Sequence, residues 1–278
     1  MRGAHAWRAP ATDVMGGRFA AAALLLVVVA GLGPVAEGVV PPPERVAGAV
    51  ADANRAAGRA QPLRIEVQLR VEGSPPSDGV LISYPTGSAQ LVVRDAEGSV
   101  ERHLRRGAEY TIRRNGVPEQ VFHRLLPPIF LLQADSGRSL RSKLEGLGAD
   151  ADALSLGRLD DRDCHVLGGR PDPRRFGLEG TPASLWSDLQ THEPVRVITR
   201  EGVSYLLGPP TLFEPLRLPA WVEILEPGGF RAVLEVKGAA PADAAPAGFS
   251  SDPEAPAPTA PRPPRPPLGG SGDRAISE

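Results

Sequence analysis

The sequence predicts an α+β fold in which a continuous antiparallel sheet carries a helical insertion over its apolar face. Apolar and polar residues alternate over residues 63–72, the pattern of a strand with one face in water. Over residues 160–237, short runs of β-branched and aromatic residues are separated by Gly, Pro and Asp, as in a meander of strands. Over residues 118–147 the apolar period becomes helical. The helical segment therefore separates two sets of strands.

Residues 1–38 have the features of a secretory signal peptide. Arg18 precedes the apolar run 19–33, which is shorter than the roughly 20 apolar residues that span a membrane. Small residues follow at positions 36–38, where cleavage is expected. Met15 is an alternative start, which would make the residues before it non-native. We expect export to the periplasm, with an uncleaved membrane anchor as the alternative.

The next part of the chain predicts one helix and a run of strands. Residues 44–58 form the helix, because Pro43 and Glu44 suit its first turn and apolar residues recur at helical spacing. The strands that follow are separated by turn residues. They are expected at residues 63–72, 79–84, 89–94, 99–104 and 109–114.

The insertion is expected to form a lid. A helix is predicted over residues 118–126, and Pro127 and Pro128 end it. Residues 129–132 are an apolar plug, and residues 136–147 form a second helix with Ser136 at its N-cap. The plug could complete the core or leave a gap between lid and sheet.

The second set of strands includes the only cysteine. These strands are expected at residues 153–159, 164–167, 183–188, 194–200, 203–207, 218–225 and 230–237. Cys164 has no partner for an internal disulfide and shares a strand face with Val166, so we expect it to be buried. His165 points to the opposite face and cannot activate the thiol.

Three motifs in this part resemble the LolA/LolB-like superfamily of periplasmic carriers and receptors of outer-membrane lipoproteins. They are the polar turn and strand Asp-Arg-Asp-Cys-His-Val-Leu at 161–167, the strand Leu-Trp-Ser-Asp at 185–188, and Leu218-Pro219 ahead of a strand and a Gly hairpin. The resemblance implies a half-barrel domain over residues 39–238. It would have about eleven strands, with helices covering its concave face.

The resemblance further implies a non-enzymatic carrier that holds acyl chains, of a lipid or an acylated protein, between sheet and lid. The ligand-binding residues predicted for such a slot are apolar or aromatic. They are Ile65, Val67, Leu69, Val80, Ile82, Leu91, Val93, Tyr110, Ile112, Phe130, Leu131, Leu132, Leu140, Trp186 and Trp221. The carriers line their cavity with aromatics, which are only 5% of this chain, so a general lipid role is favoured over lipoprotein trafficking. The alternative is a regulatory or scaffolding module of the cell envelope with a filled interior.

Other classes of function lack support in the sequence. The net charge of −2 argues against nucleic-acid binding, and the arginines 102, 105, 106, 113 and 114 are interpreted as the solvated face of a hairpin. No nucleophile motif, metal-ligand spacing or phosphate-binding glycine loop is present, so we expect no catalytic residues, no metal and no cofactor. Residues 239–278 are Ala/Pro-rich and are predicted to be a disordered tail. The Pro-Arg repeat in the tail is either a ligand for an envelope partner or passive, and a monomer is expected.

Overall fold

Among the residues that the structure describes, the main sheet contains thirteen antiparallel strands in the order β6-β5-β4-β3-β2-β1-β15-β14-β11-β10-β9-β8-β7. The computed structural model describes residues 40–107, 109–120, 123–169 and 182–242. The strands are β1 (Leu63–Val71), β2 (Ser77–Ser83), β3 (Ala89–Arg94), β4 (Val100–Arg106), β5 (Glu109–Arg114), β6 (Val117–Pro118), β7 (Leu154–Leu159), β8 (Arg162–Gly168), β9 (Ser184–Asp188), β10 (Pro194–Ile198), β11 (Ser204–Leu207), β12 (Pro210–Phe213), β13 (Leu216–Pro219), β14 (Trp221–Leu225) and β15 (Arg231–Pro241).

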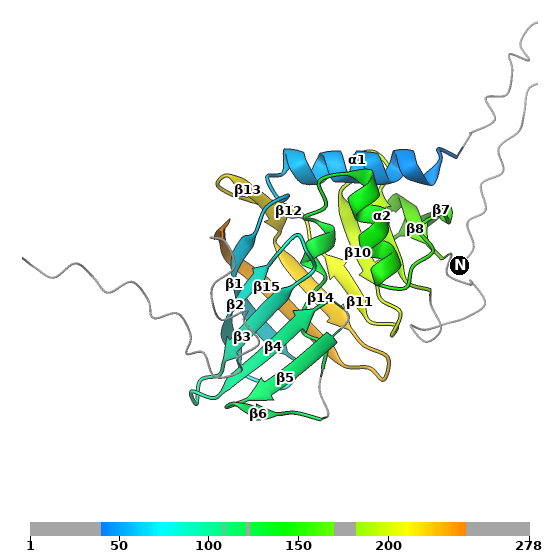
Figure 1. The fold of residues 1–278 in the computed structure, drawn as a ribbon. Coiled ribbons are helices and arrows are strands. Elements are labelled where there is room, and N and C mark those ends of the chain that lie inside the picture. The colour runs from blue at the N-terminus through cyan, green and yellow to red at the C-terminus, as the bar shows by residue number, and fades with distance from the viewer. Residues whose placement is uncertain (1–39, 108, 121–122, 170–181, 243–278) are drawn as a thin grey trace, which may run out of the picture. The chain divides into compact units, whose positions relative to one another are not determined.

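Strand β15 joins the two sets of strands, because it pairs with β1 on one side and β14 on the other. Strands β6 and β7 lie at the two edges, so the sheet is open, and it curves around the helices (Figure 1). Strands β12 and β13 form a separate hairpin, so the single strand predicted over residues 218–225 is wrong: Leu218 and Pro219 belong to β13, and β14 begins at Trp221. The predicted α+β fold with one large antiparallel sheet is confirmed. Strand β15 runs to Pro241, past the expected domain end at residue 238.

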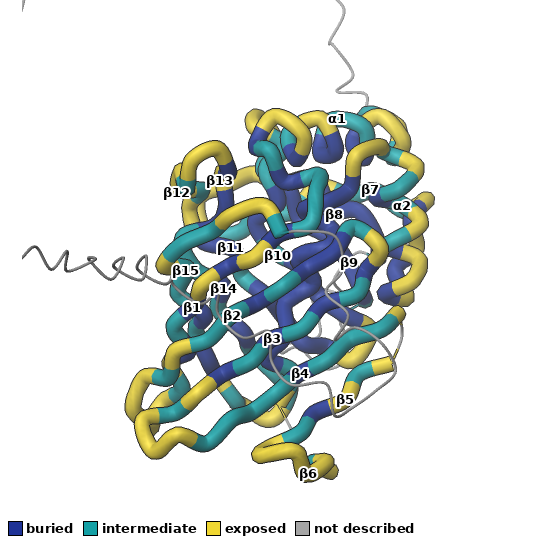
Figure 2. The backbone as a smooth tube through the Cα atoms, turned by 60° about the vertical axis from the view of Figure 1, so that its left-hand side comes forward, coloured by how far each residue is buried: buried dark blue, intermediate teal, exposed yellow. Residues whose placement is uncertain are grey.

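The alternation of apolar and polar residues that predicted β1 matches the alternation of buried and exposed residues along the strand. Leu63, Ile65 and Val67 are at most 3% exposed, whereas Arg64 and Glu66 between them are exposed. The same alternation runs along β3 (Figure 2). We call the face that carries Ile65 the inner face of the sheet.

The helices α1 (Pro43–Ala56) and α2 (Gly137–Gly146) pack against each other and share a core with the inner face. Ser136 caps α2 as predicted, since its Oγ accepts a hydrogen bond from the Ser139 N–H at 3.2 Å. A Cβ at Gly137 would lie 2.8 Å from the Gly48 nitrogen of α1, so glycine is required for this close approach.

The helix predicted over residues 118–126 is wrong. Val117 and Pro118 form the edge strand β6, and residues 123–128 are not helical. Their backbone groups bind side chains instead. The Leu126 N–H donates to the Tyr110 hydroxyl at 3.2 Å, and the Arg124 carbonyl accepts from the Tyr205 hydroxyl at 2.9 Å. These long-range partners replace the hydrogen bonds of a helix, and they are not visible in a local pattern.

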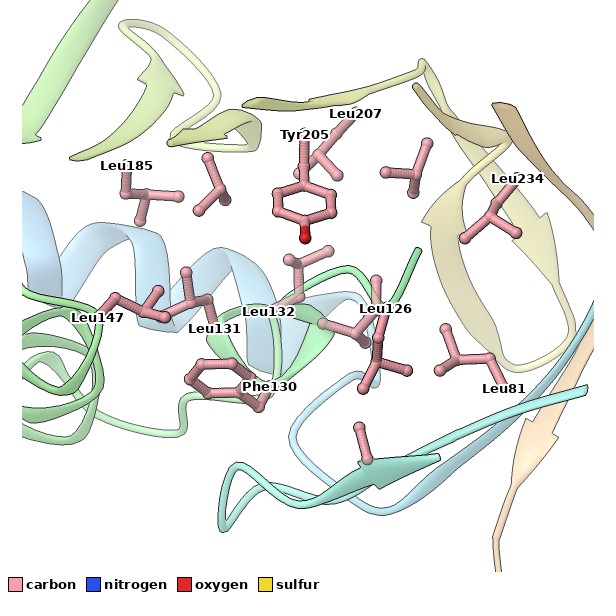
Figure 3. Close-up of a cluster of buried hydrophobic side chains, with 14 of the residues drawn as sticks. Leu81, Leu126, Phe130, Leu131, Leu132, Leu147, Leu185, Tyr205, Leu207 and Leu234 are labelled. Carbon is pink, nitrogen blue, oxygen red and sulfur yellow. The ribbon is translucent and has the colours of Figure 1, made fainter. Parts of the chain in front are cut away.

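The apolar plug fills the centre of the fold. The turn η1 (Ile129–Leu131) and Leu132 are at most 4% exposed, and Tyr205 of β11 points toward Leu132 (Figure 3). The cavity between this segment and the sheet, lined by Ile65, Val67 and Ile129 among others, is only about 10 Å³. That is about the size of one water-sized probe, so the plug completes the core here.

Polar side chains hold the plug in place. The Ser83 hydroxyl of β2 donates to Gln133 Oε1 at 2.7 Å, and Gln133 Nε2 donates to the Ser83 carbonyl at 3.0 Å. Asn54 Nδ2 of α1 donates to the Leu131 carbonyl at 3.1 Å. All three side chains are at most 1% exposed, so losing one partner would leave a buried polar group unsatisfied. The segment after Pro128 is therefore fixed to both α1 and β2.

Candidate functional site

A cleft of about 600 Å³ lies at one end of the sheet, where the β1–β2, β3–β4 and β14–β15 turns meet. We call it the end cleft. Its lining is Leu69, Val71, Ser74, Pro75, Ser77, Val93, Asp95, Ala96, Glu97, Ser99, Glu101, Ile112, Arg114, Glu119, His123, Leu125 and Phe230.

The floor of the end cleft is apolar because the inner-face positions of several strands converge there. Leu69 and Val71 come from β1, Val93 from β3 and Ile112 from β5. Leu125 and Phe230 close the floor from the opposite side. The His123 ring stacks on Phe230 with centroids 3.4 Å apart, and its Nδ1 lies 2.8 Å from Glu226 Oε2. Residues that the sequence assigned to a helix thus form one wall of the cleft.

The rim of the end cleft carries excess negative charge. Asp95, Glu97, Glu101 and Glu119 face a single arginine, Arg114. Arg114 Nη2 lies 2.8 Å from a Glu101 oxygen, and its Nε lies 3.6 Å from Glu119. Hydrogen bonds from His103 and then from Arg114 lower the pKa of Glu101 to about 2, although burial acts in the opposite direction. Glu101 is therefore ionised at neutral pH.

A buried hydrogen-bonded chain stands behind this rim. His103 is 0% exposed, with Nε2 2.5 Å from Glu101 and Nδ1 3.0 Å from the Tyr110 hydroxyl. The Tyr110 oxygen in turn accepts a hydrogen bond from the Leu126 N–H. Burial raises the pKa of Tyr110 well above its ordinary value. The chain ties β4 to β5 and to the segment that contains Leu125.

The structure brings only some of the predicted ligand-binding residues together at a cavity. Leu69, Val93 and Ile112 line the end cleft, and Tyr110 lines a second, smaller cavity. The remaining inner-face and lid residues are buried in the core. They are Ile65, Val67, Leu91, Phe130, Leu131, Leu132 and Leu140. The slot expected beneath the plug is therefore filled where Pro127 and Ile129 meet the sheet, and open space lies at the end of the sheet.

Four of the predicted ligand-binding residues lie on the outer face of the sheet, opposite the inner face. Leu81 pairs with Ile65 on the inner face, so its neighbours Val80 and Ile82 point outward. Val80, Leu81 and Ile82 are all apolar, so the sequence alone could not show which of them face the core. Trp186 packs with Cys164 and Val166 in an outer cluster, and Trp221 lies beside the inward-facing Val222.

The interpretation of the arginine cluster was correct only in part. Arg102 pairs with Arg113 on the outer face, but Arg105 and Arg114 share the inner face with His103. Arg105 places its guanidinium carbon 4.5 Å from the centre of the Phe130 ring. For Cys164 the prediction is confirmed, since it is 0% exposed and His165 points to the other face.

The described residues contain neither a candidate metal site nor a candidate membrane-spanning helix. No group of three or more His, Cys, Asp or Glu side chains among them could hold a metal ion. Within the same residues no helix is long and apolar enough to span a membrane.

No protein-family model and no curated protein matches the sequence. Among solved structures, a LolA superfamily protein from Nitrosomonas europaea matches at a TM-score of 0.46 and 11% identity, over 74% of this chain and 96% of that one. A lipoprotein-sorting protein domain from Vibrio parahaemolyticus matches at a TM-score of 0.43 and 9% identity, over 74% and 96%. A DUF1329 family protein from Desulfovibrio piger matches at 0.42 and 12%, over 72% and 94%. The first two carry the names of the group that the sequence resembles.

Proposed function

We propose that the protein is a non-enzymatic, exported protein that binds an acyl chain or similar hydrophobic ligand in the end cleft. The observation that carries the proposal is the cleft of about 600 Å³ with six apolar side chains on its floor. Small-molecule sites in proteins range over roughly 300–1,000 Å³ and are mostly apolar. The apolar run at residues 19–33 supports export, and the periplasm is the proposed location.

The size of the cleft is sufficient for useful affinity. Each methylene transferred from water contributes about 0.8 kcal/mol, so about ten of them contribute about 8 kcal/mol. Before the costs of association, that corresponds to a dissociation constant of about 1 μM. Leu69 and Ile112 are at most 7% exposed, so they already form an ordered surface for the chain to contact.

The charge of the rim indicates what the polar end of the ligand should be. Four carboxylates and one guanidinium surround the floor, and they disfavour a second carboxylate. A neutral acyl ester or amide should therefore bind more tightly than the fatty-acid anion with the same chain. The preference should shrink in high salt, where surface charges are screened.

A pair of matched valine substitutions tests the site. Val71 and Val80 are both half-buried residues of adjacent strands, but Val71 lines the end cleft and Val80 points outward. Val71→Glu places a charge in the cleft and should weaken binding of the neutral fluorescent probe N-phenyl-1-naphthylamine by about tenfold or more. Val80→Glu should leave the titration unchanged. Equal binding by both variants would remove the end cleft as the site.

The filled centre of the fold favours a second candidate, an envelope scaffolding or regulatory module that acts through its surface. The observation in its favour is the cavity of only about 10 Å³ beneath the plug. A wild-type protein that binds neither the neutral probe nor an acyl ester would support this function over the carrier.

A further inference from the structure

A second cavity, of about 250 Å³, lies on the other side of the segment 123–126 from the end cleft. Leu125 lines the end cleft, whereas Arg124 and Leu126 line this cavity. Its charged lining includes Arg105, Arg124 and Arg200, and we call it the arginine pocket. The two linings share no residue, so the two cavities are separate sites.

Arg105 is a half-buried cation, and the charge of Glu201 acts on it from beyond ion-pair distance. Its guanidinium lies over Phe130, and its Nε–H donates to the Gly107 carbonyl at 3.1 Å. Among the described residues no carboxylate lies within ion-pair distance of Arg105. None of these residues accepts a hydrogen bond from its other four N–H groups. Burial lowers the pKa of Arg105, as expected for a cation removed from water. An anion in the pocket would satisfy these donors.

Two more guanidinium groups lie at the same cavity. The Arg124 guanidinium carbon is 5.6 Å from the Tyr110 ring centre, and Nη2 is 3.9 Å from Glu201, too far for a hydrogen bond. Arg200 passes over Gly148, where a Cβ would come within 3.1 Å of its Cδ. With Glu145 and Glu201 as the acidic residues, the lining keeps an excess of one positive charge. Arg200 is exposed, whereas Arg105 and Arg124 are partly buried at the pocket, so they are the two candidates to hold a ligand.

We propose that the arginine pocket binds a phosphate-type oxyanion, held by the guanidinium groups of Arg105 and Arg124. A guanidinium offers two parallel N–H donors that match the oxygen spacing of phosphate. The oxyanion is either free phosphate or the phosphate of a lipid head group, and both present the same oxygens to the arginines. The inference goes beyond the proposed function, because it requires no ligand in the end cleft.

Isothermal titration calorimetry with inorganic phosphate, and sedimentation with vesicles, test the pocket and separate the two sources. The vesicles are phosphatidylcholine with or without dioleoyl phosphatidic acid. Arg105→Gln and Arg124→Gln should each reduce binding by about tenfold, the value of one charge-assisted hydrogen bond. Arg102→Gln removes the same charge from the outer face of the same strand and should have no effect. Glu201→Gln removes the competing carboxylate and should strengthen binding.

Each outcome decides the proposal. Phosphate binding that is lost in Arg105→Gln supports a free-ion site, and vesicle binding that needs phosphatidic acid and Arg105 supports a lipid phosphate. No binding to either probe overturns the proposal, as does an equal loss in Arg102→Gln. If Arg105→Gln fails to fold, Arg124→Gln and Glu201→Gln decide it. Val71→Glu in the end cleft should leave phosphate binding unchanged, so the two sites can fail independently.

Discussion

Breaking the ion pair between Arg59 and Glu193 should destabilise the fold more than any exposed pair. The Arg59 side chain is 1% exposed, and its Nη2 lies 2.7 Å from Glu193 Oε2. The same nitrogen donates to Asn54 Oδ1 at 3.1 Å, and Nη1 donates to the Arg217 carbonyl at 3.4 Å. The pair therefore joins the end of α1 to the β9–β10 turn and to β13. Burial lowers the pKa of Arg59, and Glu193 opposes that shift.

Glu193→Ala leaves the arginine cation buried without its partner. Removing one member of a buried pair costs about 3–5 kcal/mol, so the free energy of unfolding should fall by about that amount. The double variant Arg59→Met/Glu193→Gln removes both charges and should recover part of the loss, because no unpaired charge stays buried, while Asn54 Oδ1 still loses a hydrogen-bond donor. Urea denaturation followed by circular dichroism at pH 7 measures both changes.

The pair between Arg70 and Glu235 is the matched control. Its side chains are 56% and 37% exposed, so Glu235→Ala should lower the free energy of unfolding far less than Glu193→Ala does. High salt should weaken the exposed pair and leave the Arg59 effect nearly unchanged. A loss below about 1 kcal/mol in Glu193→Ala, or a double variant no more stable than the single one, would refute this reasoning.

Two further predictions concern titration and the thiol. The pKa of Glu101 is held at about 2, below its ordinary 4.5, so the native state binds fewer protons in that window. The ionised Glu101 stabilises the fold above pH 4.5, and this contribution is lost as the pH falls through 2. Glu101→Gln should therefore reduce the pH dependence of the free energy of unfolding, measured with urea, over that range. Burial raises the pKa of Cys164, which is 0% exposed, so Ellman's reagent should detect no thiol in native protein and one in urea. A fast native reaction would contradict the burial.

Local patterns were sufficient for several elements of the fold. Strict alternation predicted β1, and the cap at Ser136 predicted the start of α2. The side of the strand on which Cys164 lies also followed from alternation alone. These features depend on neighbours within a few residues, which is why a single sequence reveals them.

The site depends on partners far apart in the sequence. The pairing of β1 with β15 brings Phe230 to the floor of the end cleft opposite Leu69, and no local pattern encodes that pairing. Residues 123–126 are not helical because Tyr110, Tyr205 and Glu226 bind their backbone, which overrides a helical apolar period. Arg105 lies in a strand rich in charged residues, which predicts a solvated side chain, and its contact with Phe130 cannot be seen in the local pattern.

Mass spectrometry of organic extracts tests the central claim most directly. Wild-type protein and the Val71→Glu and Val80→Glu variants would be purified from the same envelope fraction and extracted in parallel. Wild type and Val80→Glu should each yield an acyl-chain compound approaching one molecule per protein, and Val71→Glu should yield little. An empty wild-type extract, or the same yield from Val71→Glu, would contradict binding in the end cleft.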